Sequence, residues 1–102
     1  MIVIFRKDPA AQGGGVFALF PEDPADFSGR LCTSYEHVGQ HCEANYNSCM
    51  ARSRPATPAE YASLLGELRT IGYKNIVIRQ RATQEMHAKR LAAAKATAKS
   101  VK

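Results

Sequence analysis

The chain contains no apolar run that approaches the roughly 20 residues needed to cross a lipid bilayer. Its longest apolar stretches are residues 1–5 and 16–20. The first stretch lacks a basic leader and is too short for the core of a signal peptide, so we expect a cytoplasmic protein that does not bind membranes. The three cysteines are an odd number, which argues against a closed framework of disulfide bonds.

The charges are distributed unevenly along the 102 residues, whose formal net charge is +5. Residues 1–78 hold seven basic and eight acidic residues, whereas residues 79–102 hold seven basic residues against Glu85 alone. A basic C-terminal quarter favours contact with nucleic acid or an acidic partner surface, although a tail that only keeps the protein soluble would look the same. The candidate nucleic-acid-binding residues are Arg79, Arg81, Lys89, Arg90, Lys95, Lys99 and Lys102.

Hydrophobic patterning predicts one small α+β domain over residues 1–81, followed by a basic Ala/Lys-rich tail over residues 82–102. We expect Pro21 to end the second strand, because proline donates no hydrogen bond to a neighbouring strand. Runs rich in β-branched and aromatic residues predict strands at residues 2–6, 16–20, 31–38 and 75–80, with a short edge strand near 50–53.

Residues 57–71 carry the signals of an amphipathic helix. Thr57 and Glu60 are spaced to satisfy each other's backbone N–H groups at the helix start, and Gly72 suits the left-handed residue that ends a helix. One apolar stripe is formed by Tyr61, Leu64, Leu65, Leu68 and Ile71. We therefore predict a small antiparallel sheet packed by this one helix, with a helical or disordered tail whose apolar side is thin after Leu91.

Both faces of the predicted strands are apolar, and one helix covers only one face of a sheet. We therefore expect a homodimer or a bound partner to cover the second face of the sheet.

Two histidines and three cysteines lie within 18 residues, which raises the question of a metal site: Cys32, His37, His41, Cys42 and Cys49. Structural zinc sites pair their ligands as C-x2-C or H-x3-H, and only His37 and His41 match one half of that pattern. A catalytic Cys–His pair would lack a recognisable third group to orient it. We expect no metal, no cofactor and no enzymatic activity.

Five segments in order resemble a family of short uncharacterised proteins carried by bacterial phages, plasmids and integrative elements. The segments are residues 3–6 (VIFR), 18–22 (ALFPE), 34–41 (SYEHVGQH), 54–61 (RPATPAEY) and 71–73 (IGY). The resemblance covers about residues 2–81, and residues 35–41 are its most specific part. Cys42 stands where the family has a small residue, and the tail lies outside the resemblance. The resemblance implies a mobile genetic element as the setting and supplies no reaction.

Small proteins of mobile elements often bind and block a host machine, which needs one complementary surface of about 800 Å² per partner and no catalytic group. We therefore expect a non-enzymatic binding protein that modulates host defence or nucleic-acid processing, similar in size and style to anti-CRISPR proteins. Its partner would be a host protein or a ribonucleoprotein complex. The alternative is an accessory protein that binds nucleic acid non-specifically through the basic tail. The candidate partner-binding residues are Tyr35, Glu36, His37, Gln40 and His41.

Overall fold

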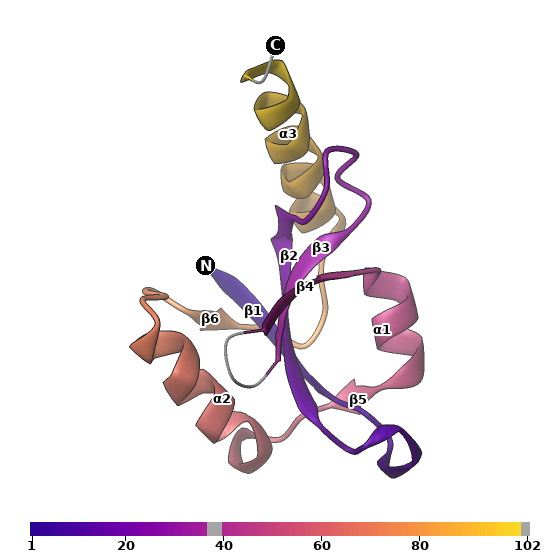
Figure 1. Ribbon diagram of the computed structural model, residues 1–102, viewed down its shortest axis with the longest axis vertical. Coiled ribbons are helices and arrows are strands. Elements are labelled where there is room, and N and C mark those ends of the chain that lie inside the picture. The colour runs from indigo at the N-terminus through magenta and orange to yellow at the C-terminus, as the bar shows by residue number, and fades with distance from the viewer. Residues whose placement is uncertain (37–39, 101–102) are drawn as a thin grey trace.

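The computed structural model describes residues 1–36 and 40–100, which form an α+β fold around a mixed six-stranded sheet (Figure 1). A 3-10 turn at Ala10–Gln12 lies between the first two strands. None of the helices in the described part of the chain is long and apolar enough to span a bilayer. The elements in chain order are β1 (Ile2–Lys7), β2 (Val16–Pro24), β3 (Cys32–Glu36), β4 (Gln40–Ala44), α1 (Tyr46–Arg52), β5 (Arg54–Pro55), α2 (Pro58–Thr70), β6 (Val77–Ile78) and α3 (Gln84–Ser100).

The sheet is built around β1, which pairs with three other strands. The strand order is β4-β3-β2-β1-β5, and β6 also pairs with β1. β6 pairs with Ile2 and Val3, and β5 pairs with Arg6 and Lys7. The β1–β6 pair is parallel, so the prediction of a purely antiparallel sheet is wrong. The chain crosses over through α2 before it returns as β6, and such a crossover allows the returning strand to run parallel.

Alternate residues of β1 enter two separate apolar cores. Val3 and Phe5 pack with Leu64 and Leu68 of α2 on one face. Ile4 packs on the other face, where Cys49 of α1 is buried. The sheet is therefore packed by more than the one predicted helix, and the uncovered face from which we predicted a homodimer carries α1.

Helix α1 lies in a segment where the sequence shows no clear periodicity. Asn45 is its N-cap, and its side-chain oxygen accepts a hydrogen bond from the backbone N–H of Ser48 at 3.0 Å. The edge strand predicted near residues 50–53 is wrong, because Met50 to Arg52 complete this helix. Polar residues cover most of the solvent side of α1, so its apolar contribution comes from Tyr46, Cys49 and Met50 alone.

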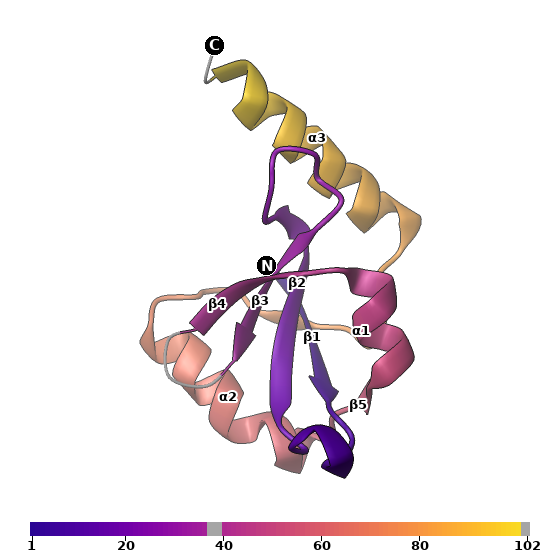
Figure 2. The same ribbon diagram turned by 45° about the vertical axis from the view of Figure 1, so that its right-hand side comes forward.

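Strand β2 continues through Pro21 to Pro24, beyond the end that we predicted. The register of the β2–β3 pair shifts between Phe20 and Pro24, and proline is tolerated at such an irregularity because no donor is needed there. The loop between β2 and β3 then lies beside α3, whose far end extends beyond the loop (Figure 2). Glycine is required in this loop at Gly29, where φ is +74° and an added Cβ would lie 3.0 Å from the Cβ of Ala94.

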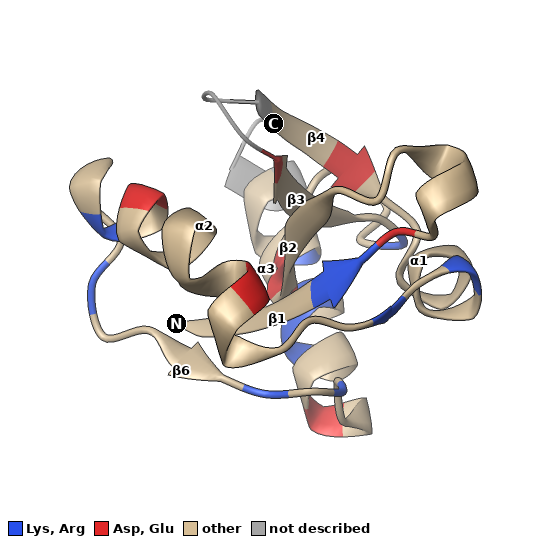
Figure 3. Cartoon of the chain, turned by 90° about the horizontal axis from the view of Figure 1, so that it is seen from below, with Lys and Arg blue, Asp and Glu red and all other residues tan. Residues whose placement is uncertain are grey.

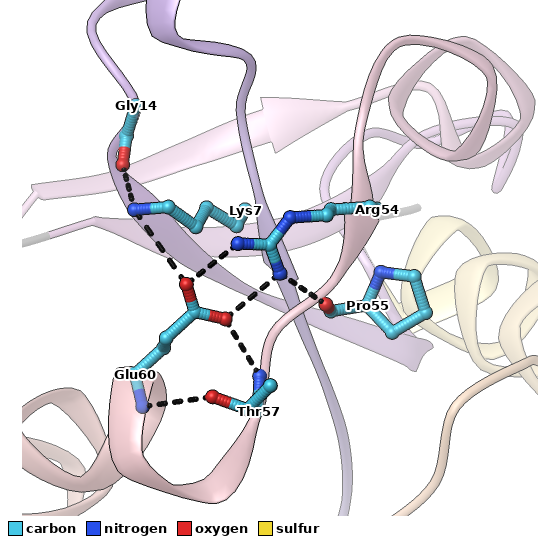
Figure 4. A network of polar contacts seen from close by, with 6 residues as sticks. All are labelled: Lys7, Gly14, Arg54, Pro55, Thr57 and Glu60. Atoms are coloured by element: carbon cyan, nitrogen blue, oxygen red, sulfur yellow. Dashed lines mark hydrogen bonds and ion pairs between the residues drawn. The ribbon is translucent and has the colours of Figure 1, made fainter.

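The start of α2 is fixed by a polar network centred on Glu60 (Figure 4). Thr57 and Glu60 form the predicted capping box, with hydrogen bonds of 3.3 and 2.9 Å. The guanidinium of Arg54 binds both carboxylate oxygens of Glu60, at 2.8 and 2.6 Å. Lys7 lies 3.9 Å from the same carboxylate and donates to the carbonyl of Gly14. The network ties the first turn of α2 to both β5 and β1.

We predict that Leu68→Ala lowers the free energy of unfolding by about 2–5 kcal/mol, because its side chain is fully buried between α2 and the sheet. Leu65 is only partly buried at the margin of the same core, so Leu65→Ala should cost less. Urea denaturation followed by circular dichroism measures both. Equal costs would mean that α2 is rotated relative to this arrangement.

We also predict that Glu60 stabilises the fold in a pH-dependent manner. The hydrogen bonds from Arg54, and then the backbone N–H of Thr57, lower the pKa of Glu60 from 4.5 to about 2. A lowered pKa in the folded state gives stability that is present above pH 4.5 and is lost as the pH falls towards about 2.

The test compares the melting temperatures of wild type and Glu60→Gln across that range. The variant should melt lower near neutral pH, and the difference should vanish near pH 2. Glu43→Gln, which changes an exposed carboxylate of β4, is the matched control. A constant difference at every pH would contradict the assignment.

Candidate partner-binding site

The predicted partner-binding residues lie on or between β3 and β4, which pair antiparallel. Tyr35 and His41 are cross-strand partners. The side chain of Tyr35 is fully buried, and its hydroxyl donates a hydrogen bond to the carboxylate of Glu67 on α2. Tyr35 is therefore a core residue, and its assignment to the partner surface is wrong. Side chains alternate between the two faces of a strand, so the side chain of Tyr35 is buried in the core while that of Glu36 is exposed to solvent.

The other predicted residues divide between exposed positions and positions that the structure does not describe. Glu36 and His41 are exposed. His37 lies outside the described residues, as does the side chain of Gln40.

His41 belongs to a surface that the sequence did not reveal as a unit. Its Nε2 atom lies 2.9 Å from the hydroxyl oxygen of Tyr73, which follows α2 in the chain. The two residues border a hollow of about 410 Å³ together with Ile71 and Gly72. We call these four residues the His41–Tyr73 surface. Ile71 is 47% exposed, which makes it one of the few large apolar side chains open to solvent.

Packing beneath this surface holds its two rings in place. The ring of Tyr73 stacks on buried Phe20 with a centroid separation of 5.0 Å. The imidazole of His41 meets the ring of Tyr35 edge-on at 4.7 Å. Gly72 has φ +114°, so glycine suits the turn that swings Tyr73 back towards the sheet. The surface is therefore preorganised by core aromatic residues.

The hydroxyl of Tyr73 remains protonated near neutral pH. Burial raises its pKa, and the negative charge of Asp23 raises it further. The His41–Tyr73 pair thus offers a neutral phenol and an imidazole next to an apolar side chain. Exposed Arg69 and Lys74 flank this stretch in the chain. An apolar centre with a charged rim is the usual composition of a protein interface.

The basic residues predicted to bind nucleic acid do not form one set (Figure 3). Lys89 pairs with Glu22 at 3.4 Å. Arg79 and Arg81 are exposed after β6, whereas exposed Lys95 lies in the outer half of α3. The side chain of Lys99 and the whole of Lys102 lie outside the described residues.

Arg90 lies in the predicted basic tail but is buried. Only 6% of the residue is exposed, and its guanidinium donates to the carbonyls of Gly29 and Pro21 at 2.8 and 2.7 Å. Its Nη1 also lies 2.8 Å from Nδ1 of His87, whose pKa is lowered by burial and then by the charge of Arg90. The assignment of Arg90 to nucleic-acid binding is wrong, because these contacts attach α3 to the end of β2.

The three cysteines are free thiols. Cys32 and Cys49 are buried and Cys42 is exposed. Burial raises the pKa of the Cys32 thiol to about 11, so it stays protonated. No three His, Cys, Asp or Glu side chains in residues 1–36 and 40–100 lie together as a metal site would require.

We predict that Arg90→Met destabilises the fold by about 1–3 kcal/mol, because it leaves the carbonyls of Pro21 in β2 and Gly29 in the β2–β3 loop without their donor. Lys95→Met removes the same charge from an exposed position of α3 and should change stability by less than about 0.5 kcal/mol. Thermal and urea unfolding measure both. A neutral Arg90→Met would show that α3 is only loosely attached.

The chain matches no protein-family model, no curated protein and no solved structure. The candidate site therefore rests on the geometry of the chain's own side chains.

Proposed function

We propose that the chain is a non-enzymatic binding protein that modulates a host defence or nucleic-acid-processing machine, and that the His41–Tyr73 surface contacts this partner. The setting in a mobile genetic element comes from the sequence resemblance. The observation that carries the proposed contact is the hollow beside half-exposed Ile71, bordered by the hydrogen-bonded His41 and Tyr73.

The arrangement has the features of an interface centre. Tyrosine is enriched among the residues that dominate binding energy, because it offers a large rigid ring and a polar tip. Tyr73 is already held by its stack on Phe20 and by His41, so little side-chain freedom is lost on binding. Ile71 supplies apolar area that becomes buried when a partner covers it.

The charge near this surface favours a partner of acidic character. Exposed Arg69 and Lys74 lie on either side of Ile71 and Tyr73 in the chain, and residues 68–75 contain no acidic residue. A cationic rim accelerates encounter with an acidic surface and weakens as salt rises. Machines that handle nucleic acid offer two acidic surfaces, the nucleic acid itself and acidic protein patches, and we propose that the His41–Tyr73 surface contacts an acidic protein patch.

The test is affinity capture from a host lysate, with and without nuclease, using wild type and two surface variants. We expect a protein partner that is retained after nuclease treatment and is lost with Ile71→Asp, because the new carboxylate lies in the apolar centre of the interface. Disruption of such a central residue costs about 2 kcal/mol or more, a loss of roughly 30-fold in affinity.

Phe27→Asp is the matched control, since Phe27 is another exposed apolar residue and lies in the β2–β3 loop. It should retain the partner. Loss of every partner after nuclease would instead support the accessory protein that binds nucleic acid. Equal loss in both variants would contradict the assignment to the His41–Tyr73 surface.

A further inference from the structure

A second hollow, of about 470 Å³, lies on the α1 side of the sheet, where the chain leaves β6 and passes α1. It is separate from the His41–Tyr73 surface, and ligand binding in it does not depend on that surface. Within the described part of the chain, its lining contains two arginines and no carboxylate: Arg6, Tyr46, Met50, Ala51, Pro55, Gln80 and Arg81.

Arg6 is the unusual member of this lining. It belongs to the central strand β1 and is only 5% exposed. Its Nε donates to the hydroxyl of Ser53 at 3.0 Å, and its Nη2 donates to the carbonyls of Met50 and Ser53. These contacts use three of the five N–H groups of the guanidinium.

The two N–H groups of Nη1 remain. The described residues supply no acceptor for them, yet these residues contain no fully buried side-chain nitrogen that lacks a partner. Nη1 of Arg6 therefore reaches solvent, and the hollow that Arg6 lines is where it does so. A nearly buried guanidinium thus presents its free edge to an open cavity.

The positive charge of Arg6 is not neutralised by the described part of the chain. Its polar partners are a hydroxyl and two carbonyls, and none of them carries a full negative charge. Burial lowers the pKa of Arg6, and the nearby charge of Arg81 lowers it further. An isolated buried charge is costly unless an ion of opposite sign accompanies it. The cavity that both arginines line gives an anion access to Arg6.

Tyr46 adds a hydroxyl group to the same cavity. Its hydroxyl oxygen accepts the backbone N–H of Ala82 at 2.8 Å, and its own hydrogen has no acceptor among the described residues. The ring is held edge-on against His87 at 4.8 Å. The cavity therefore has two guanidinium groups and a phenol as donors, while Met50 and Pro55 supply apolar wall.

The geometry points to this cavity as a binding site for the phosphate group of a small phosphomonoester. A phosphate dianion offers several acceptor oxygens in a tetrahedral arrangement, which paired guanidinium groups bind at two oxygens each. The volume exceeds what one phosphate needs, so the apolar wall has room for the organic part of the ligand.

The test titrates the full chain, labelled with nitrogen-15, with adenosine monophosphate, inorganic phosphate and adenosine at matched ionic strength. Adenosine monophosphate and inorganic phosphate should both shift the amide resonances of Ser53, Arg81 and Ala82, with tighter binding for the monophosphate. Adenosine, which lacks the phosphate, should leave them unchanged.

Arg81→Gln should weaken binding of adenosine monophosphate by about tenfold or more, because it removes one of the two guanidinium groups from an exposed, tolerant position. Arg79→Gln is the matched control. It removes the same charge two residues away, outside the cavity lining, where the guanidinium donates to the carbonyl of Ile78. It should reduce the affinity less than twofold.

Three results would overturn the inference. One is the absence of shifts with both phosphate compounds at millimolar concentration. Another is an equal loss of affinity in Arg79→Gln and Arg81→Gln, which would indicate attraction to the general positive field. The third is binding of inorganic phosphate without adenosine monophosphate, which would exclude an organic phosphate ligand.

Discussion

The apolar character of β1 on both faces is the constraint on which the rest of the structure depends. The consecutive residues Val3, Ile4 and Phe5 are all buried, so their side chains form one apolar row on each face of the sheet. Both rows need cover, because apolar side chains left in contact with water would cost stability. α2 covers one row and α1 the other, and the two helices come from chain segments on either side of β5. Both candidate sites lie at the margins of these covered faces, where chain segments leave the sheet.

The sequence was a good guide where local signals decide structure. The start of α2 follows from Thr57 and Glu60, and β1 follows from its run of β-branched and aromatic residues. α1 was missed because it is held by Cys49 against a distant strand and has little periodicity of its own. The attachment of the C-terminal helix α3 to β2 was not predicted, for the same reason. The partners of Arg90 are carbonyls 61 and 69 residues away, which no local pattern records.

The candidate sites were predictable only in part. The sequence indicated His41 as a candidate. Its neighbours on the surface, Ile71 and Tyr73, follow the C-terminal end of α2 and are distant from His41 in the chain. Tyr35 was predicted to lie on the partner surface with its neighbours in the sequence. Side chains alternate between the two faces of a strand, however, and that of Tyr35 points into the core. The sequence predicts Arg6 only as the last residue of a strand. One signal in the sequence was that this charged residue ends an otherwise apolar strand. A cation is rarely buried without a partner, so a charged residue at such a position indicates a candidate site.

The pairing of β1 with both β5 and β6 has a consequence for local unfolding. β5 precedes α2 and β6 follows it, so both ends of the α2 segment are attached to one strand. The helix is the middle of a closed chain loop, and neither end can separate without breaking strand hydrogen bonds at β1. Partial opening therefore gains little chain entropy while it exposes apolar area of α2. α2, β5, β6 and β1 should open as one cooperative unit, even though the two short strands have only two residues each.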